Sequence, residues 1–139
     1  MQLTKHTDYA FRTLIYLASN RDQLSNIQTI ADTFELSKSH LMKVVNKLVN
    51  LGWVESVRGK KGGVRLAQEP YQIGVADVIM KMEQTLSPIN CESPLCTINS
   101  ACTLKPVLWQ AQQEYLRFLK KYTLADVLND PTVQILKMA

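Results

Sequence analysis

The sequence predicts a mainly α-helical protein with a small β-hairpin, arranged as a winged helix-turn-helix domain followed by a cysteine loop and a long helix. Three observations predict this class. Two short amphipathic segments are separated by a turn, a basic glycine-rich hairpin follows them, and all three cysteines precede a long amphipathic segment. With 139 residues and 46% hydrophobic content, the chain can bury one core, or a small core with an extension.

The first two helices are indicated by apolar residues at helical spacing. In the first, from Asp8 to Ser19, the apolar stripe is Ala10, Phe11, Leu14, Ile15, Leu17 and Ala18. In the second it is Ile27, Ile30, Ala31 and Phe34. Ser25 stands three residues before Gln28, which is the spacing of a capping box in which each side chain satisfies the other residue's backbone amide. We therefore expect Ser25 to start the second helix.

A third helix follows after a three-residue turn and completes a helix-turn-helix. Ser37 is its expected N-cap, and Gly52 is placed to end it. Its apolar stripe is Leu41, Val44, Val45 and Leu48, while the opposite face is polar and basic. The segment from about 38 to 51 is thus the expected recognition helix, which would lie in a DNA major groove.

The hairpin after the recognition helix has a basic tip. β-Forming residues at 53–57 and 64–66 flank the tip at 58–63, and four of the five glycines of the chain fall between 52 and 63. A Gly-x-x-Gly match at 59–62 also occurs in RNA-clamping loops, but those loops join helices and these flanks have strand character. The segment from about 53 to 67 is therefore predicted to be a DNA-binding wing.

Positive charge is concentrated in the N-terminal half. Residues 1–66 carry ten Lys+Arg against five Asp+Glu, a net charge of +5, whereas residues 67–139 carry six against seven, a net charge of −1. On a helix-turn-helix with a wing, this surplus indicates binding to phosphate, although a basic face without a ligand is the alternative. The predicted DNA-binding residues are Gln28, Ser37, Lys38, Ser39, His40, Lys43, Arg58, Lys60, Lys61 and Gly62. For His40, a capping or surface position is the alternative.

Two further helices are expected after the wing. The first has the stripe Val75, Val78, Ile79 and Met82, and the second begins at Thr103 as N-cap with Pro106 in its first turn. Leu104, Leu108, Ala111, Tyr115, Phe118 and Tyr122 alternate four and three apart in the second, which predicts a dimerisation helix. Packing within the chain is the alternative. A capping box of Thr123 and Asp126 predicts a final short helix at 124–128, and the tail after Pro131 carries no signal.

These elements divide the chain into three parts. Residues 1–80 form the expected DNA-binding domain, residues 81–103 the end of the connecting helix and the loop, and residues 104–139 the dimerisation helix and a C-terminal helix. The N-terminus lacks the apolar core of a signal peptide and no long apolar run occurs, so we expect a cytoplasmic protein without a membrane partner.

Cys91, Cys96 and Cys102 are separated by four and five residues, which indicates a cluster of metal ligands. Thiolates are good donors to soft metals and to iron–sulfur clusters, and a turn-rich loop allows several thiolates to converge. Structural zinc and a disulfide are the alternatives. Four ligands normally complete such a site, so one ligand is missing from the trio.

Several motifs together resemble the Rrf-two family of winged-helix regulators. They are Met1-Gln2-Leu3-Thr4, Asp8-Tyr9-Ala10-Phe11-Arg12, the run from Val57 to Leu66, the cysteine trio, and Tyr122-Thr123-Leu124-Ala125-Asp126. The resemblance covers essentially the whole chain and is greatest to the nitric-oxide-sensing repressors of the family. It implies a homodimer, not an enzyme, that binds palindromic operator DNA as a cluster-loaded repressor and is released when nitric oxide damages the cluster.

The resemblance also implies a ligand set. Cys91, Cys96 and Cys102 match the family's cluster cysteines, and Asp8 of the partner subunit matches the proposed fourth ligand, with His6 as a nearby competitor. A 4Fe-4S cluster is favoured if Asp8 is the ligand, and a 2Fe-2S cluster is the alternative. An iron- or redox-responsive regulator is the alternative function within this class, and a small iron–sulfur electron carrier is the alternative outside it.

Overall fold

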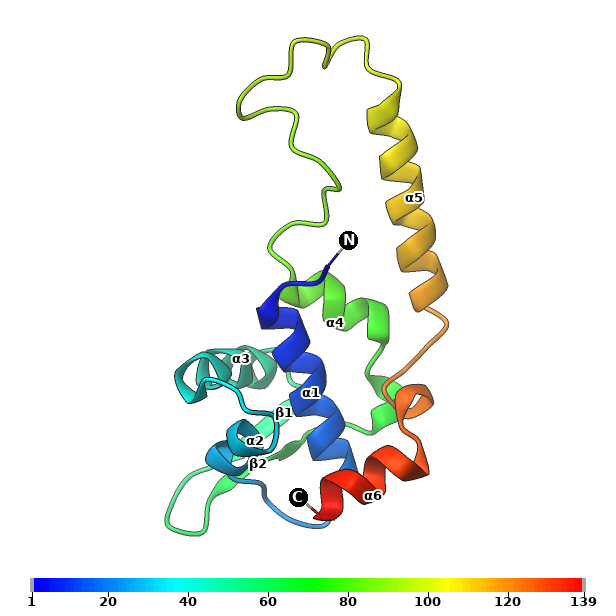
Figure 1. Cartoon of the computed structure of the whole chain (residues 1–139). Coiled ribbons are helices and arrows are strands. Elements are labelled where there is room, and N and C mark those ends of the chain that lie inside the picture. The colour runs from blue at the N-terminus through cyan, green and yellow to red at the C-terminus, as the bar shows by residue number, and fades with distance from the viewer. Residues whose placement is uncertain (1, 139) are drawn as a thin grey trace.

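The computed structural model describes residues 2–138 and confirms a mainly helical fold with one β-hairpin. Its α-helices are α1 (Lys5–Ser19), α2 (Ile27–Thr33), α3 (Lys38–Asn50), α4 (Val75–Met82), α5 (Leu104–Leu119) and α6 (Asp130–Met138). The strands β1 (Val54–Val57) and β2 (Gly63–Leu66) pair antiparallel, and two 3-10 turns are η1 (Pro70–Gln72) and η2 (Ala125–Val127). In Figure 1, α1 runs through the body of the molecule, from which the loop after α4 and the helix α5 project.

Helix α1 is the centre of the core. Thr4 is its N-cap and accepts a hydrogen bond from the Thr7 amide, and its buried face includes Ala10, Leu14 and Leu17. Helix α1 contacts α3, α4, α6 and β2. The apolar spacing that predicts α1 thus also places it in the middle of the packed domain.

The helix-turn-helix is confirmed, but the predicted Ser25–Gln28 capping box is wrong. The N-cap of α2 is Asn26, whose side chain accepts from the Gln28 amide at 2.7 Å. Ser25 instead exchanges two backbone hydrogen bonds of 2.9 Å with Val64 of β2. The Ser25 amide, which a capping box would bond to the Gln28 side chain, is therefore already bonded to the hairpin. The Gln28 side chain donates to Asp32 instead.

Helix α3 begins and ends where its sequence predicts. The Ser37 hydroxyl accepts from the His40 amide, and Gly52 follows the helix with φ of +76°, a conformation that glycine adopts without strain. The buried side chains of α3 are Leu41, Val44, Val45 and Leu48, the predicted stripe. Away from this buried stripe, α3 carries the exposed residues Lys38, Ser39 and Lys43.

The hairpin is also confirmed, with Val54 opposite Leu66 and Val57 opposite Gly63. At the tip, the Gly62 amide donates to the Gly59 carbonyl at 3.0 Å, and Gly59 has φ of +113°. A Cβ at Gly62 would collide with the Val57 carbonyl oxygen. Two of the wing glycines are therefore required by the turn itself.

The C-terminal segment differs most from expectation. The helix expected at 124–128 is the short turn η2, because Leu128 has extended backbone, although Asp126 accepts from the amide and hydroxyl of Thr123 at 2.7 and 2.8 Å. The tail without a sequence signal forms α6 instead. Helix α6 packs on α1, and its Leu136 is buried in the shared core. The chain end thus returns to the N-terminal domain.

Helix α5 begins at the predicted place without the predicted capping bond. Thr103 occupies the N-cap position and Pro106 lies in the first turn, but the Thr103 side chain caps no amide within the described chain. The segment from 84 to 103 between α4 and α5 contains no helix or strand among its described residues. Within residues 2–138, no helix combines the length and the apolar content needed to cross a membrane.

We predict that α6 contributes directly to the stability of the core. Leu136→Ala removes a side chain that is 5% exposed and should lower the free energy of unfolding by roughly 2–4 kcal/mol. Ile135→Ala is the matched control, because Ile135 is 66% exposed on the same helix. This variant should change the free energy of unfolding by about 0.5 kcal/mol or less. Urea denaturation measures both, and equal effects would contradict the packing of α6 on α1.

Candidate functional site

The recognition helix and the wing present most of the predicted DNA-binding residues to solvent. Lys38, Ser39 and Lys43 are exposed on α3, and Gln28 is exposed on α2. Arg58, Lys60 and Lys61 are exposed at the wing tip. Exposed cationic side chains on a helix and on an adjacent hairpin are the groups that contact DNA phosphates in helix-turn-helix proteins.

The charges of the wing are divided between its stem and its tip. On the stem, Glu55 and Arg65 lie opposite each other in the register and form an ion pair. At the tip, no acidic side chain of the described chain pairs with Arg58, Lys60 or Lys61. The positive charge of the tip is therefore available to an external anion.

His40 has a different position from the other candidate residues of α3. Its ring is half-buried, with its centroid 4.7 Å from that of Tyr9 and 5.8 Å from that of His6. Burial lowers the pKa of His6, and the charges of Lys47 and His40 lower it further against the opposing effect of Glu83. The structure thus directs His40 toward α1, where it joins the recognition helix to the first turns of α1.

The three cysteines lie in the projecting loop as free thiols. Cys91 is buried, Cys96 is exposed and Cys102 is half-buried. The Cys96 amide donates to the Cys91 carbonyl at 3.0 Å, so a tight turn separates these two residues. In the described part of one chain, no three His, Cys, Asp or Glu side chains lie close enough together to hold a metal ion. The donor types fit an iron–sulfur cluster, since soft thiolates are its usual ligands.

Asp8 lies in the first turn of α1, and among the described residues it forms no metal-binding group with the cysteines of its own chain. Its carboxylate accepts from Nε of Arg12 at 2.9 Å, and both side chains are 43% exposed. These residues line an open hollow of about 440 Å³ together with Leu3 and Phe11. An exposed pair of this kind contributes only about 0–1 kcal/mol, so Asp8 can exchange Arg12 for another partner at little cost.

The predicted dimerisation stripe divides into two faces of α5. Leu104, Ala111 and Phe118 are exposed on α5, and the exposed Val107 continues this face. Tyr122 is also exposed but lies beyond the end of the helix. Leu108 and Tyr115 are half-buried, while Gln112 and Leu116 form the buried face of α5. Helix α4 contacts α5. An apolar strip therefore remains on the solvent side of α5.

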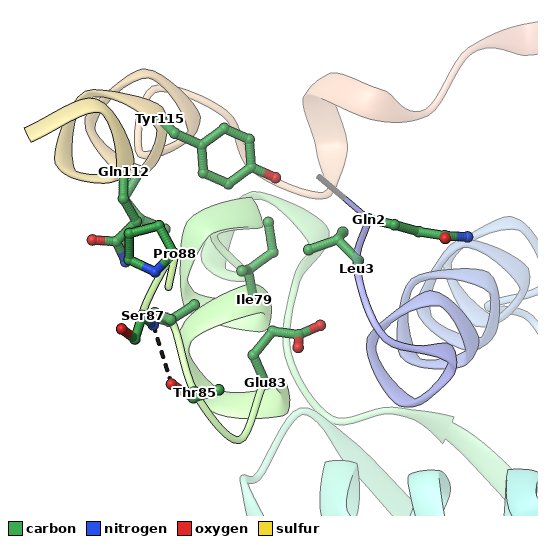
Figure 2. Close-up of a pocket in the computed structure, with 11 residues that line it drawn as sticks. Gln2, Leu3, Ile79, Glu83, Thr85, Ser87, Pro88, Gln112 and Tyr115 are labelled. Carbon is green, nitrogen blue, oxygen red and sulfur yellow. Dashed lines mark hydrogen bonds between the residues drawn. The ribbon is translucent and has the colours of Figure 1, made fainter. Parts of the chain in front are cut away.

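A small cavity lies where the N-terminal segment, the end of α4, the start of the cysteine loop and α5 meet. It has a volume of about 210 Å³, and Leu3, Ile79, Glu83, Ser87 and Tyr115 are among its lining residues. Figure 2 shows these side chains converging from the four segments. The root of the cysteine loop thus lies directly against the N-terminus of α1.

Glu83 is the polar centre of this junction. Its Oε1 accepts from the Thr4 amide at 2.9 Å, the Thr4 hydroxyl at 3.0 Å and the Thr7 hydroxyl at 2.5 Å. Burial raises the pKa of Glu83, but the hydrogen bonds from Thr7 and Thr4 and the charge of His6 outweigh it, so the pKa lies below its usual value. Sequence reasoning missed Glu83, because its partners are 76 and 79 residues away and no local pattern links them.

Comparisons with known proteins agree with this architecture. A family model described as "Rrf2: Iron-dependent Transcriptional regulator" matches residues 3–130. The HTH-type transcriptional regulator NsrR of Bacillus subtilis is 44% identical over 99% of both chains. Among solved structures, IscR of T. potens has a TM-score of 0.75 with 27% identity, covering 94% of this chain and 88% of its own. The global cysteine regulator CymR of B. subtilis has a TM-score of 0.74 with 28% identity, covering 91% and 95%.

The family match covers the winged helix, the cysteine loop and α5, and the similarity to NsrR extends over nearly the whole length of both proteins. The structural neighbours IscR and CymR share the same fold at lower identity. The chain therefore belongs to the Rrf2 (Rrf-two) family of transcriptional regulators.

Proposed function

We propose that this protein is a homodimeric repressor that binds palindromic operator DNA while its cysteine loops hold an iron–sulfur cluster, and that nitric oxide ends this binding by damaging the cluster. One observation carries the proposal most directly. Three free thiols lie in a loop that leads into a helix with an exposed apolar face, on a chain whose N-terminal part is a basic winged helix. The 44% identity to the regulator NsrR supports it.

DNA binding is assigned to α3 and to the wing. The exposed N-terminal side chains of α3, Lys38, Ser39 and Lys43, reach base edges or adjacent phosphates in the major groove. Arg58, Lys60 and Lys61 neutralise phosphates beside it, or enter the minor groove. Both elements pack on α1 in the common core, so they bind DNA as one rigid unit.

Dimerisation is assigned to α5. Leu104 is 57% exposed, Val107 58% and Phe118 55%, so a continuous apolar face is open to water in one chain. Burying such a face against a second copy is favourable at about 25 cal/mol per Å² of apolar area. A symmetric dimer pairs the two winged helices with the two halves of a palindrome.

The ligand roles are divided between two subunits. Cys91, Cys96 and Cys102 hold the cluster, whose iron supplies the centre with which nitric oxide reacts, and Asp8 of the partner subunit is the fourth ligand. A 4Fe-4S cluster is favoured over 2Fe-2S. Carboxylate is a harder donor to iron than thiolate, so its contact is the weakest of the four. Because Asp8 belongs to α1, its release frees the winged helix of that subunit from the other subunit's loop.

Iron availability is the second candidate signal. The description of the matching family model as iron-dependent favours it, since loss of iron empties the same thiol site. The two signals are distinguished by exposing the loaded protein separately to nitric oxide and to an iron chelator while operator binding is followed. Release by the chelator alone would replace nitric oxide with iron as the signal.

We predict that Asp8→Ala weakens cluster retention and lowers the affinity of the loaded protein for its operator about tenfold, equivalent to about 1.4 kcal/mol. Asp22→Ala is the matched control, because Asp22 is an exposed acid just beyond the other end of α1. Cluster absorption and fluorescence anisotropy with operator DNA measure the two properties. If both variants behaved like the parent, the ligand role of Asp8 would be refuted.

We also predict that Lys60→Ala weakens binding to all DNA sequences by the same factor. It should also reduce the slope of log affinity against log salt concentration by about 1. The reason is the loss of one phosphate contact at the wing tip. Lys120→Ala, at the end of α5, removes the same charge outside the proposed DNA surface and should leave the slope unchanged. A loss confined to one DNA sequence would assign Lys60 to base recognition instead.

A further inference from the structure

The junction around Glu83 connects three segments with separate proposed roles. Glu83 directly follows α4 and is the residue from which the cysteine loop departs. Through one carboxylate oxygen it binds Thr4 and Thr7, which lie at the start of α1. Asp8 is the next residue after Thr7. The first turn of α1 and the root of the cysteine loop are therefore held together within one subunit.

The same junction reaches the recognition helix by two routes. On one side, Nζ of Lys47 in α3 donates to the carbonyl of Met82, the residue before Glu83, at 3.4 Å. On the other side, the rings of His6 and Tyr9 in α1 contact the ring of His40 in α3. A displacement of Glu83 can therefore shift α3 by two routes, one through α4 and one through α1.

These bonds are stronger than ordinary surface hydrogen bonds. The acceptor is a carboxylate at the N-terminus of a helix, where hydrogen bonds are charge-assisted and the helix dipole favours negative charge. Thr7 is fully buried and Glu83 is half-buried, so water competes poorly for the bond between them. These bonds consequently hold Glu83 firmly against the start of α1.

We propose that Glu83 is a positioning residue that couples the root of the cysteine loop to the recognition helix α3 through the first turn of α1. This inference rests on the proposed function, since it says how a change in the loop reaches DNA inside one subunit. It adds to the contact of Asp8 with the partner subunit, because it needs no second chain. Disrupting the junction loosens α3 while leaving its DNA-facing side chains intact.

Matched substitutions separate coupling from mere stability. Thr7→Val keeps the shape of the side chain but removes the hydroxyl that donates to Glu83, whereas Thr7→Ser keeps the hydroxyl and removes a methyl group. Glu83→Ala removes the acceptor, and Glu83→Gln retains an acceptor oxygen without the charge. A coupling role predicts a defect in Thr7→Val and Glu83→Ala, recovery in Thr7→Ser, and partial recovery in Glu83→Gln, which loses the charge that strengthens these bonds.

The first measurement is amide hydrogen exchange in the cluster-free protein, which reports local opening. In Thr7→Val and Glu83→Ala we expect faster exchange together at two amides, that of Asp8, which bonds the Thr4 carbonyl, and that of His40, which bonds the Ser37 hydroxyl. In Thr7→Ser both rates stay near the parent values, and in Glu83→Gln both lie between those of the parent and those of Glu83→Ala. Faster exchange at Asp8 alone, or a uniform increase through the whole core, would overturn the coupling. Should Glu83→Ala unfold, Thr7→Val carries the same test.

The second measurement is DNA affinity of the loaded protein. Thr7→Val should bind operator about fivefold more weakly, the lower end of typical coupling between sites, with unchanged affinity for non-specific DNA and recovery in Thr7→Ser. Operator affinity equal to the parent would overturn the proposal. If the parent itself bound operator equally with and without cluster, the proposed function would fail, while paired exchange at Asp8 and His40 would still support the coupling.

Discussion

The buried face of α1 is the contact on which the rest of the structure depends. Ala10, Leu14 and Leu17 lie in the core, where α3, α4, α6 and β2 all contact the same helix. Packed interiors transmit displacement, because side chains at close packing have no free volume into which they can move. Any shift of α1 is therefore shared by the recognition helix and by α4, from which the cysteine loop departs.

This constraint explains how the proposed sensing loop can affect the proposed DNA-binding helix without touching it. The first turns of α1 carry Asp8, proposed to bind the cluster of the other subunit, together with Thr7, which is bonded to Glu83, and Tyr9, which contacts His40. Thr7, Asp8 and Tyr9 therefore connect α1 to the root of the cysteine loop, to the proposed cluster of the other subunit and to α3, respectively. A loop that projects far from the body in Figure 1 is thus connected to α3 through one short segment.

The parts of the fold that local sequence determines were predictable. Apolar periodicity, Ser37 and Gly52 defined α3, and the glycines defined the wing, because these signals act within a few residues. Ser25 could not be placed correctly, since its bonds go to Val64. Helix α6 depends on packing against α1, and the Glu83 junction on partners more than seventy residues away. For the site, the ligand role of the cysteines stays a prediction from their spacing, whereas the contacts of His40 with α1 became visible only in the fold.

In the proposed dimer, a cluster held between the subunits fixes the separation of the two recognition helices, which for half-sites one turn apart is roughly 34–36 Å. Energy transfer between two fluorophores measures that separation in the dimer. The fluorophores are attached, without cysteine chemistry, at Asn50, the exposed last residue of α3. We expect one narrow distance distribution in the loaded protein and a broader distribution after nitric oxide treatment. An identical narrow distribution in both states would contradict it.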